Sequence, residues 1–127
     1  MARFLWVCLA GAVGTGARYL LSGWLQRKLG PSFPFGTLAV NVLGCFLLGV
    51  LMQISLSTRL VPADTRVVIA IGLLGGFTTY STFNYETLAF FREGAWALGL
   101  ASVLVTVIGC LAAGLTGIAG ARWLIGN

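Results

Sequence analysis

Four long runs of apolar residues restrict the fold of this chain more than any other feature of its sequence. They cover about residues 4–25, 35–57, 67–91 and 95–121, with short connections between them. A helix needs roughly 20 mostly apolar residues to span a bilayer, whereas a transmembrane barrel shows weak alternation over about 10 residues per strand. We therefore predict an all-α integral membrane protein, with residues 1–127 forming a single domain of four transmembrane helices.

The composition supports a membrane protein and excludes several function classes. Hydrophobic residues make up 58% of the chain, charged residues 9%, and the mean hydropathy is +0.97, which leaves too few polar residues to coat a soluble globule. With no histidine and three acidic residues, metal and acid–base catalysis have little to use, so we expect no enzyme. The eight basic residues are spread over loops and helix ends and form no cluster, which argues against a nucleic-acid partner. Three cysteines fall inside the predicted spans without metal-ligand spacing, as small packing residues do: Cys8, Cys45 and Cys110.

The third apolar run contains a stretch that is a poor sequence for a plain membrane helix. Residues 72–86 read GLLGGFTTYSTFNYE, in which the adjacent Gly75 and Gly76 weaken the helical hydrogen bonding. A group of hydroxyl residues follows: Thr78, Thr79, Ser81 and Thr82. Irregular backbone at membrane depth is tolerated only where protein or a water-filled cavity surrounds it. We therefore predict that the third helix is broken in mid-membrane and that this segment is the working element.

Beyond the predicted break, helical spacing sorts the side chains onto two faces. Tyr80 and Phe83 share one face at i, i+3. A neighbouring polar face holds Thr79, Thr82 and Glu86. Aromatic residues in a span usually contact the core or lipid, but their ring edges are electropositive and are able to line the path of an anion.

Polar residues in the other spans each allow a structural and a functional interpretation. Arg18, well inside the first span, either extends its guanidinium to the headgroups or supplies a fixed positive charge that draws anions to a pore mouth. Asn41 in the second span either bonds neighbouring helices together or points an amide donor into a pore. Thr106 in the fourth span lies in line with Ser102 and Cys110, which suits either helix packing or a polar seam.

The basic residues at the ends of the spans are almost evenly divided between the two sides of the membrane. The side of the termini carries Arg3, Arg59, Arg66 and Arg122, and the opposite side carries Arg27, Lys28 and Arg92. Lysine and arginine in short loops set the orientation of a membrane protein. So small a difference is compatible either with one orientation under a weak bias or with insertion in both orientations, which would allow an antiparallel dimer.

Over nearly its whole length the chain resembles the dual-topology fluoride channels, the Fluc or CrcB family. The resemblance rests on GAVGTGARY in the first span, FGTLAVNVLGCFLLG in the second and GLLGGFTTYSTFNYE in the third. It implies an antiparallel, dual-topology homodimer of four-helix subunits in the lipid of the bacterial plasma (inner) membrane. Such a dimer would have two pores for fluoride and a structural sodium ion at its centre.

The resemblance also implies roles for individual residues. The positions that match the family's pore are Asn41, Tyr80, Ser81, Thr82 and Phe83. To these we add Thr79 from its helix face, and Thr106 as a polar residue on the fourth helix. Arg18 matches a vestibule arginine, and Gly75 and Thr78 match positions whose backbone carbonyl groups hold the sodium ion. Tyr80 departs from the pattern, since the family has phenylalanine there, and its hydroxyl is expected to alter ion transit.

The function implied is passive export of fluoride, and two other functions remain open. A proton-coupled exporter of cationic drugs would need an acid deep in a span, and Glu86, late in its segment, is the only candidate. A non-transporting assembly subunit would need only the glycine-rich helix faces. Ion flux through the purified protein separates these alternatives.

Overall fold

The computed structural model describes residues 1–126, and within them all the regular structure is helical. Among these residues, four helices are long and apolar enough to cross a membrane: Ala2–Leu29, Phe35–Ser57, Ala63–Arg92 and Trp96–Ile125. The prediction of an all-α, multi-pass membrane protein with four spanning helices is therefore confirmed.

Three of the spans extend beyond the apolar runs that predicted them, and the third begins at Ala63 rather than near residue 67. Helix α2 (Phe35–Ser57) has the predicted bounds, but α1 (Ala2–Leu29) and α6 (Trp96–Ile125) continue further at their carboxyl ends. The last turn of α1 carries Arg27 and Lys28, and the last turn of α6 carries Arg122. Cations stabilise a helix end whose carbonyl groups have no partner. Hydrophobicity therefore marks the membrane segment, while these charged turns set the helix end.

The third span is divided into several elements. In chain order they are α3 (Ala63–Val67), η1 (Val68–Leu74), α4 (Gly75–Phe77) and α5 (Tyr80–Arg92). The η1 segment is a π-helix, a wide-turn form that is frequent at functional sites. Thr78 and Thr79 belong to neither neighbouring helix, because their backbones are extended, with φ −87, ψ 161 and φ −151, ψ 115. The helical ladder is thus interrupted just after Gly75 and Gly76.

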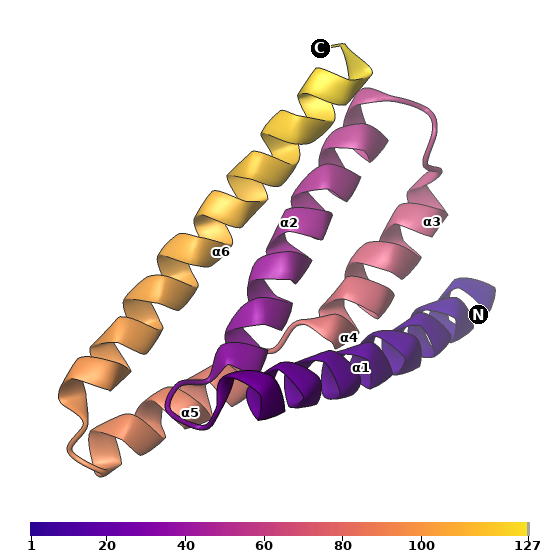
Figure 1. Cartoon of the computed structure of the whole chain (residues 1–127). Helices are drawn as coiled ribbons and strands as arrows, with labels where there is room; N and C mark the ends of the chain where they lie inside the picture. Colours follow the sequence, from indigo (N-terminus) through magenta and orange to yellow (C-terminus); the bar gives the residue numbers. More distant parts are fainter. Residues whose placement is uncertain (127) are drawn as a thin grey trace.

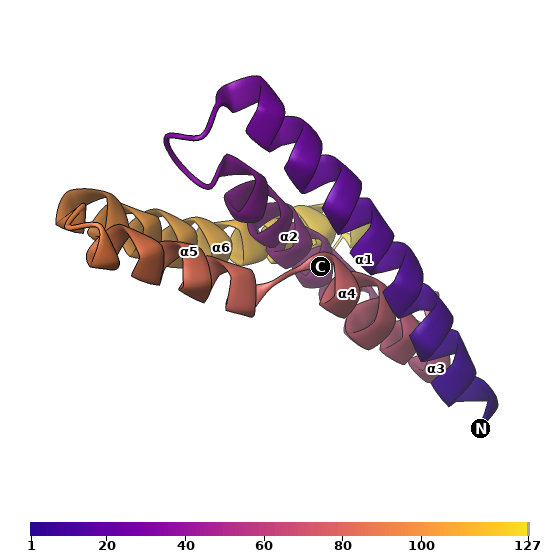
Figure 2. The ribbon, with the colours of Figure 1, turned by 90° about the horizontal axis from the view of Figure 1, so that it is seen from below.

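The two halves of the third span, on either side of the interruption, pack against different helices. Helix α2 packs along α6, as Figure 1 shows. The first half, η1 and α4, packs against α1, whereas α5 packs against α6. Figure 2 shows these two contacts on opposite sides of α2. The residues at the interruption therefore lie between the half of the span that packs on α1 and the half that packs on α6.

Small and hydroxyl-bearing residues occupy many of the buried positions. The buried polar residues are Thr37, Asn41, Ser55, Thr79, Thr87, Ser102 and Thr106. Large apolar side chains such as Phe4, Leu104 and Leu115 are exposed. In a membrane these side chains contact lipid or a partner chain, and close packing with hydrogen bonding holds the helices together.

Glycine permits the closest helix contacts. A Cβ on Gly14 of α1 would overlap the carbonyl group of Leu73 in η1. A Cβ on Gly117 of α6 would overlap the carbonyl group of Phe46 in α2. Side chains at these two positions would therefore push the helices apart and disturb the position of the interrupted segment.

Candidate functional site

Asn41 of α2 holds the backbone of Thr79 at the interruption. Its Nδ2 donates to the carbonyl oxygen of Thr79 at 2.8 Å, and the Thr79 N–H donates to its Oδ1 at 2.7 Å. Both residues are buried, each with 8% of its surface exposed. The two bonds also assign the amide, since only the oxygen accepts from an N–H and only the nitrogen donates to a carbonyl. Asn41 thus supplies the partners that Thr79 lacks in its extended backbone, which is the structural role weighed for it above.

The Thr79 side chain begins the second half of the span. Thr79 is the N-cap residue of α5, and its Oγ1 accepts from the Thr82 N–H at 3.3 Å. The same hydroxyl donates to the Thr82 Oγ1 at 2.9 Å, and it lies 3.5 Å from the hydroxyl of Ser81. An N-cap hydroxyl satisfies one of the donors left free at a helix start. The Thr79 N–H therefore leaves the helical hydrogen bonding of the first half by donating to Asn41, and the Thr79 side chain caps the start of α5.

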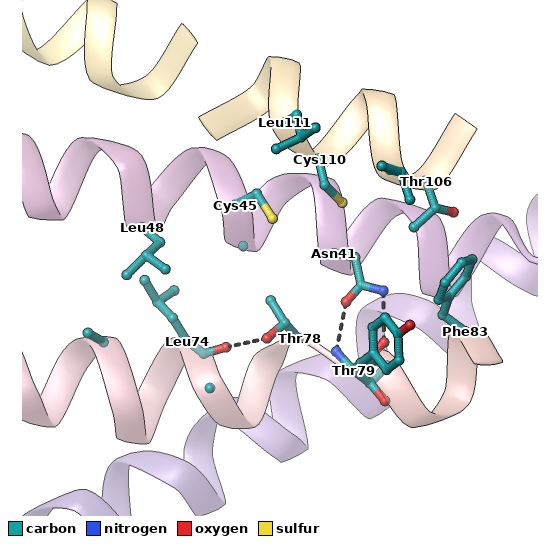
Figure 3. A pocket seen from close by; sticks show the side chains of 15 residues that line it. Asn41, Cys45, Leu48, Leu74, Thr78, Thr79, Phe83, Thr106, Cys110 and Leu111 are labelled. Carbon is teal, nitrogen blue, oxygen red and sulfur yellow. Dashed lines mark hydrogen bonds between the residues drawn. The ribbon is translucent and has the colours of Figure 1, made fainter. Parts of the chain in front are cut away.

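The interruption also changes the bonding of nearby carbonyl groups. In a continuous helix the Thr79 N–H would donate to the carbonyl oxygen of Gly75. It donates to Asn41 instead, so this Gly75 oxygen loses its helical donor. Thr78 turns its hydroxyl back to the carbonyl oxygen of Leu74 at 3.0 Å (Figure 3). Gly75 itself is exposed on the surface of the chain.

A cavity of about 420 Å³ adjoins the interruption, and we call it the Asn41 cavity. Its lining brings together predicted site residues from three spans: Asn41, Gly75, Thr78, Thr79, Tyr80, Phe83 and Thr106. Figure 3 shows Asn41 and Thr106 approaching Thr78 and Thr79 from other helices. The lining has no charged side chain; apart from these polar groups it consists of apolar residues, glycine and the thiols of Cys45 and Cys110.

The aromatic pair predicted on one face of α5 is present in this cavity. The rings of Tyr80 and Phe83 are 5.7 Å apart between centroids and meet edge to face at 65°. Phe83 is buried, with 7% of its surface exposed, whereas Tyr80 is 79% exposed. The two rings therefore differ in surroundings: Phe83 belongs to the interior of the chain, and Tyr80 projects from it.

A second cavity, which we call the Arg18 cavity, also borders Thr79. It measures about 230 Å³, and Arg18, Thr37, Thr79 and Thr82 are among its lining residues. Thr79 thus lines both cavities. Ser81 lines neither of them and reaches the site only through its contact with Thr79. Apart from Ser81, the predicted site residues therefore line one or both of two cavities that share Thr79.

Thr37 is a site residue that the sequence analysis missed. Its Oγ1 donates to Oε1 of Glu86 at 2.9 Å, while Oε2 of Glu86 is buried without a hydrogen-bond partner. Thr37 lies four residues before Asn41, so both residues face the same side of α2. That spacing is the signal that would have found it. The hydroxyl of Ser102, in contrast, lies 3.2 Å from that of Thr87, and Ser102 lines neither the Asn41 cavity nor the Arg18 cavity.

This arrangement defines a small multi-pass membrane protein whose Asn41 cavity, among the spanning helices, carries several polar groups and no charged side chain. Such a site offers hydrogen bonds to a small solute in a region with little water. Its lining provides no carboxylate, imidazole or charged amine for covalent or acid–base steps.

Comparison with known proteins identifies the family. The model of the family described as CrcB-like protein, Camphor Resistance (CrcB), matches residues 5–118, and the chain belongs to this family. A relative from Anaeromyxobacter dehalogenans is 56% identical over 99% of this chain and 100% of its own length. Relatives from Sorangium cellulosum (49% identical; 98% of each chain) and Geobacter metallireducens (46%; 98% of this chain, 100% of the relative) carry the same name, fluoride-specific ion channel FluC. These names are those of an ion channel and not of an enzyme, and the resemblance seen in the sequence is confirmed.

Proposed function

We propose that this chain is a fluoride-selective passive channel that exports fluoride across the bacterial plasma (inner) membrane. The observation that carries the proposal is the Asn41 cavity, in which amide, hydroxyl and aromatic groups line a charge-free space beside an interrupted spanning helix. The names of the full-length relatives supply the identity of the ion. We further propose that the interruption at Thr78 and Thr79 lies at mid-depth in the membrane.

Conduction requires groups that replace the water around fluoride without binding the ion too tightly. Asn41 uses one of its two amide hydrogens on Thr79, which leaves the second for an ion. Thr106 adds a buried hydroxyl, and the ring edges of Phe83 and Tyr80 add weak positive charge. Beyond Thr79, the Thr82 hydroxyl continues the path toward Arg18, which attracts anions at the pore mouth.

The channel is proposed to be an antiparallel, dual-topology homodimer with two pores. Large apolar side chains exposed along the chain, such as Leu104 and Ile108 of α6, supply surface for a partner chain and for lipid. The near-even distribution of basic residues between the two sides is compatible with insertion in both orientations.

A sodium ion is proposed to bind at the centre of this dimer. The carbonyl groups of Gly75 and Thr78 would hold it, and they fit a hard cation because carbonyl oxygen is a suitable ligand. The Gly75 oxygen has lost its helical donor and lies on an exposed residue. The ion would be structural and would offset carbonyl groups released by the interruption.

Fluoride efflux from liposomes that contain only this protein tests the function. A fluoride electrode should record rapid efflux, and chloride-loaded liposomes should retain their ion. Asn41→Asp places a negative charge beside the path and should reduce the efflux by at least tenfold, whereas Ser55→Ala, elsewhere on α2, should not. Equal efflux of both ions would refute selectivity, and no efflux from the folded protein would favour an exporter or an assembly subunit.

A further inference from the structure

Two thiols lie on α2 and α6, helices that pack along each other. Cys45 of α2 and Cys110 of α6 are free and half-buried. Both line the Asn41 cavity, and Figure 3 shows them on facing helices. The adjacent contact between Gly117 and Phe46 fixes the separation of the helices. The thiols are therefore held in position for a common ligand before any ligand binds.

The surroundings of the thiol pair restrict which ligand can bind. Neighbouring lining residues such as Leu48 and Leu111 are apolar, and no charged side chain lines the cavity. Within residues 1–126 no group of three His, Cys, Asp or Glu residues is placed to hold a metal ion. Zinc usually takes four ligands and calcium six to eight. A soft divalent ion that accepts two thiolates in a linear arrangement is satisfied by this pair alone, and the resulting complex is neutral.

We propose that Cys45 and Cys110 form a chelating site for a soft, two-coordinate divalent cation, with Hg²⁺ as the probe. Each thiol loses its proton, two Hg–S bonds form, and two protons are released to solvent. No electron is transferred. Binding ties α2 to α6 beside Asn41 and occupies part of the cavity. If this cavity is the fluoride path, as the proposed function requires, Hg²⁺ also blocks fluoride efflux.

Mercury stoichiometry tests the site without reference to transport. Cys8 is exposed on α1 and is removed first as Cys8→Ala, so that only the pair remains. Denaturing mass spectrometry of this variant, treated with equimolar HgCl₂, should show one mercury per chain and no thiol left for iodoacetamide. Adding Cys45→Ala or Cys110→Ala leaves one thiol, and about a hundredfold less glutathione should then remove the metal, because chelation is lost.

Three outcomes, two in mass spectrometry and one on a non-reducing gel, would overturn the site. They are two mercury ions bound per chain, one thiol that remains reactive, or a mercury-bridged pair of chains on a non-reducing gel. Glutathione sensitivity equal to that of the single-thiol variants would also exclude chelation. Each result is read from the protein in detergent and does not depend on channel activity.

Efflux from liposomes tests the consequence for transport. HgCl₂ should reduce fluoride efflux through the Cys8→Ala protein at least tenfold, and the dithiol dimercaptopropanol should restore it. Each single-thiol variant, compared with its own untreated efflux, should lose less than half. Chelation without block would refute the placement of the pair on the ion path. If the untreated protein passes no fluoride, the proposed function fails, while mass spectrometry still decides the metal site.

Discussion

Replacing Asn41 by leucine tests whether the clamp on Thr79 holds the interrupted span. Leucine has a similar volume but removes both the donor and the acceptor that bond Thr79 at 2.8 and 2.7 Å. The N–H and carbonyl groups of Thr79 are buried and are left without these partners. We therefore expect loss of stability together with loss of fluoride efflux, because the same residue lines the cavity.

The expected loss of stability follows from hydrogen-bond energies in membranes. An unpaired buried group costs about 1–3 kcal/mol in a soluble protein. In membrane proteins a side-chain hydrogen bond contributes about 0.6 kcal/mol on average and up to about 1.7, because the unfolded chain also finds partners in the bilayer. The membrane values apply here. Two bonds therefore give about 1–3 kcal/mol, or roughly a five- to 150-fold fall in the folding equilibrium constant.

Unfolding in mixed micelles with increasing SDS, followed by circular dichroism, measures this free-energy change. Ser55→Ala is the matched control, because Ser55 is also buried on α2 but donates only to the carbonyl oxygen of Met52, at 3.4 Å. The control should change the free energy of unfolding by less than about 0.5 kcal/mol. An Asn41→Leu protein as stable as the control would refute the clamp.

Three further predictions concern helix packing and ion transit. Gly14→Ala should lower the free energy of unfolding by about 1–3 kcal/mol, because the new Cβ would overlap the carbonyl group of Leu73. Gly16→Ala is the control and should not lower it, because a Cβ there meets nothing within 4 Å. Equal stability of the two variants would contradict the contact at Gly14. Tyr80→Phe removes an exposed phenol hydroxyl and should change fluoride efflux from liposomes, whereas unchanged efflux would exclude a role for that hydroxyl. Arg18→Gln should lower efflux most at low ionic strength, since salt screens exposed charges; a salt-independent effect would rule out anion attraction.

Local sequence features predicted the spans and the region of the interruption. Length and hydropathy predicted four spanning helices, and the Gly75–Gly76 pair with the Thr and Ser residues that follow it predicted that the third is irregular. The π-helix at Val68–Leu74 and the position of the break at Thr78 and Thr79 were not predicted to the residue. The break depends on a bond between Asn41 and Thr79, residues 38 positions apart, which no local pattern contains.

The candidate site was predicted in part. Helical periodicity placed Tyr80 and Phe83 together, and the structure brings them to one cavity with Asn41. Periodicity also grouped Thr79 with Thr82, and their hydroxyls are bonded at 2.9 Å. It did not predict that Thr37 would bond Glu86, because that contact depends on how α2 crosses α5.

The sequence by itself determined the membrane environment, the number of spans and the family, since these depend on composition, length and motifs. Tertiary structure alone decided which polar groups meet. The two halves of the third span pack against different helices, and Thr79 reaches Asn41. The packing of α2 along α6 brings the thiols of Cys45 and Cys110 to one cavity. The crossing of the helices and their close contacts at glycine determine which of these groups come together. Both depend on packing between segments that are far apart in the chain.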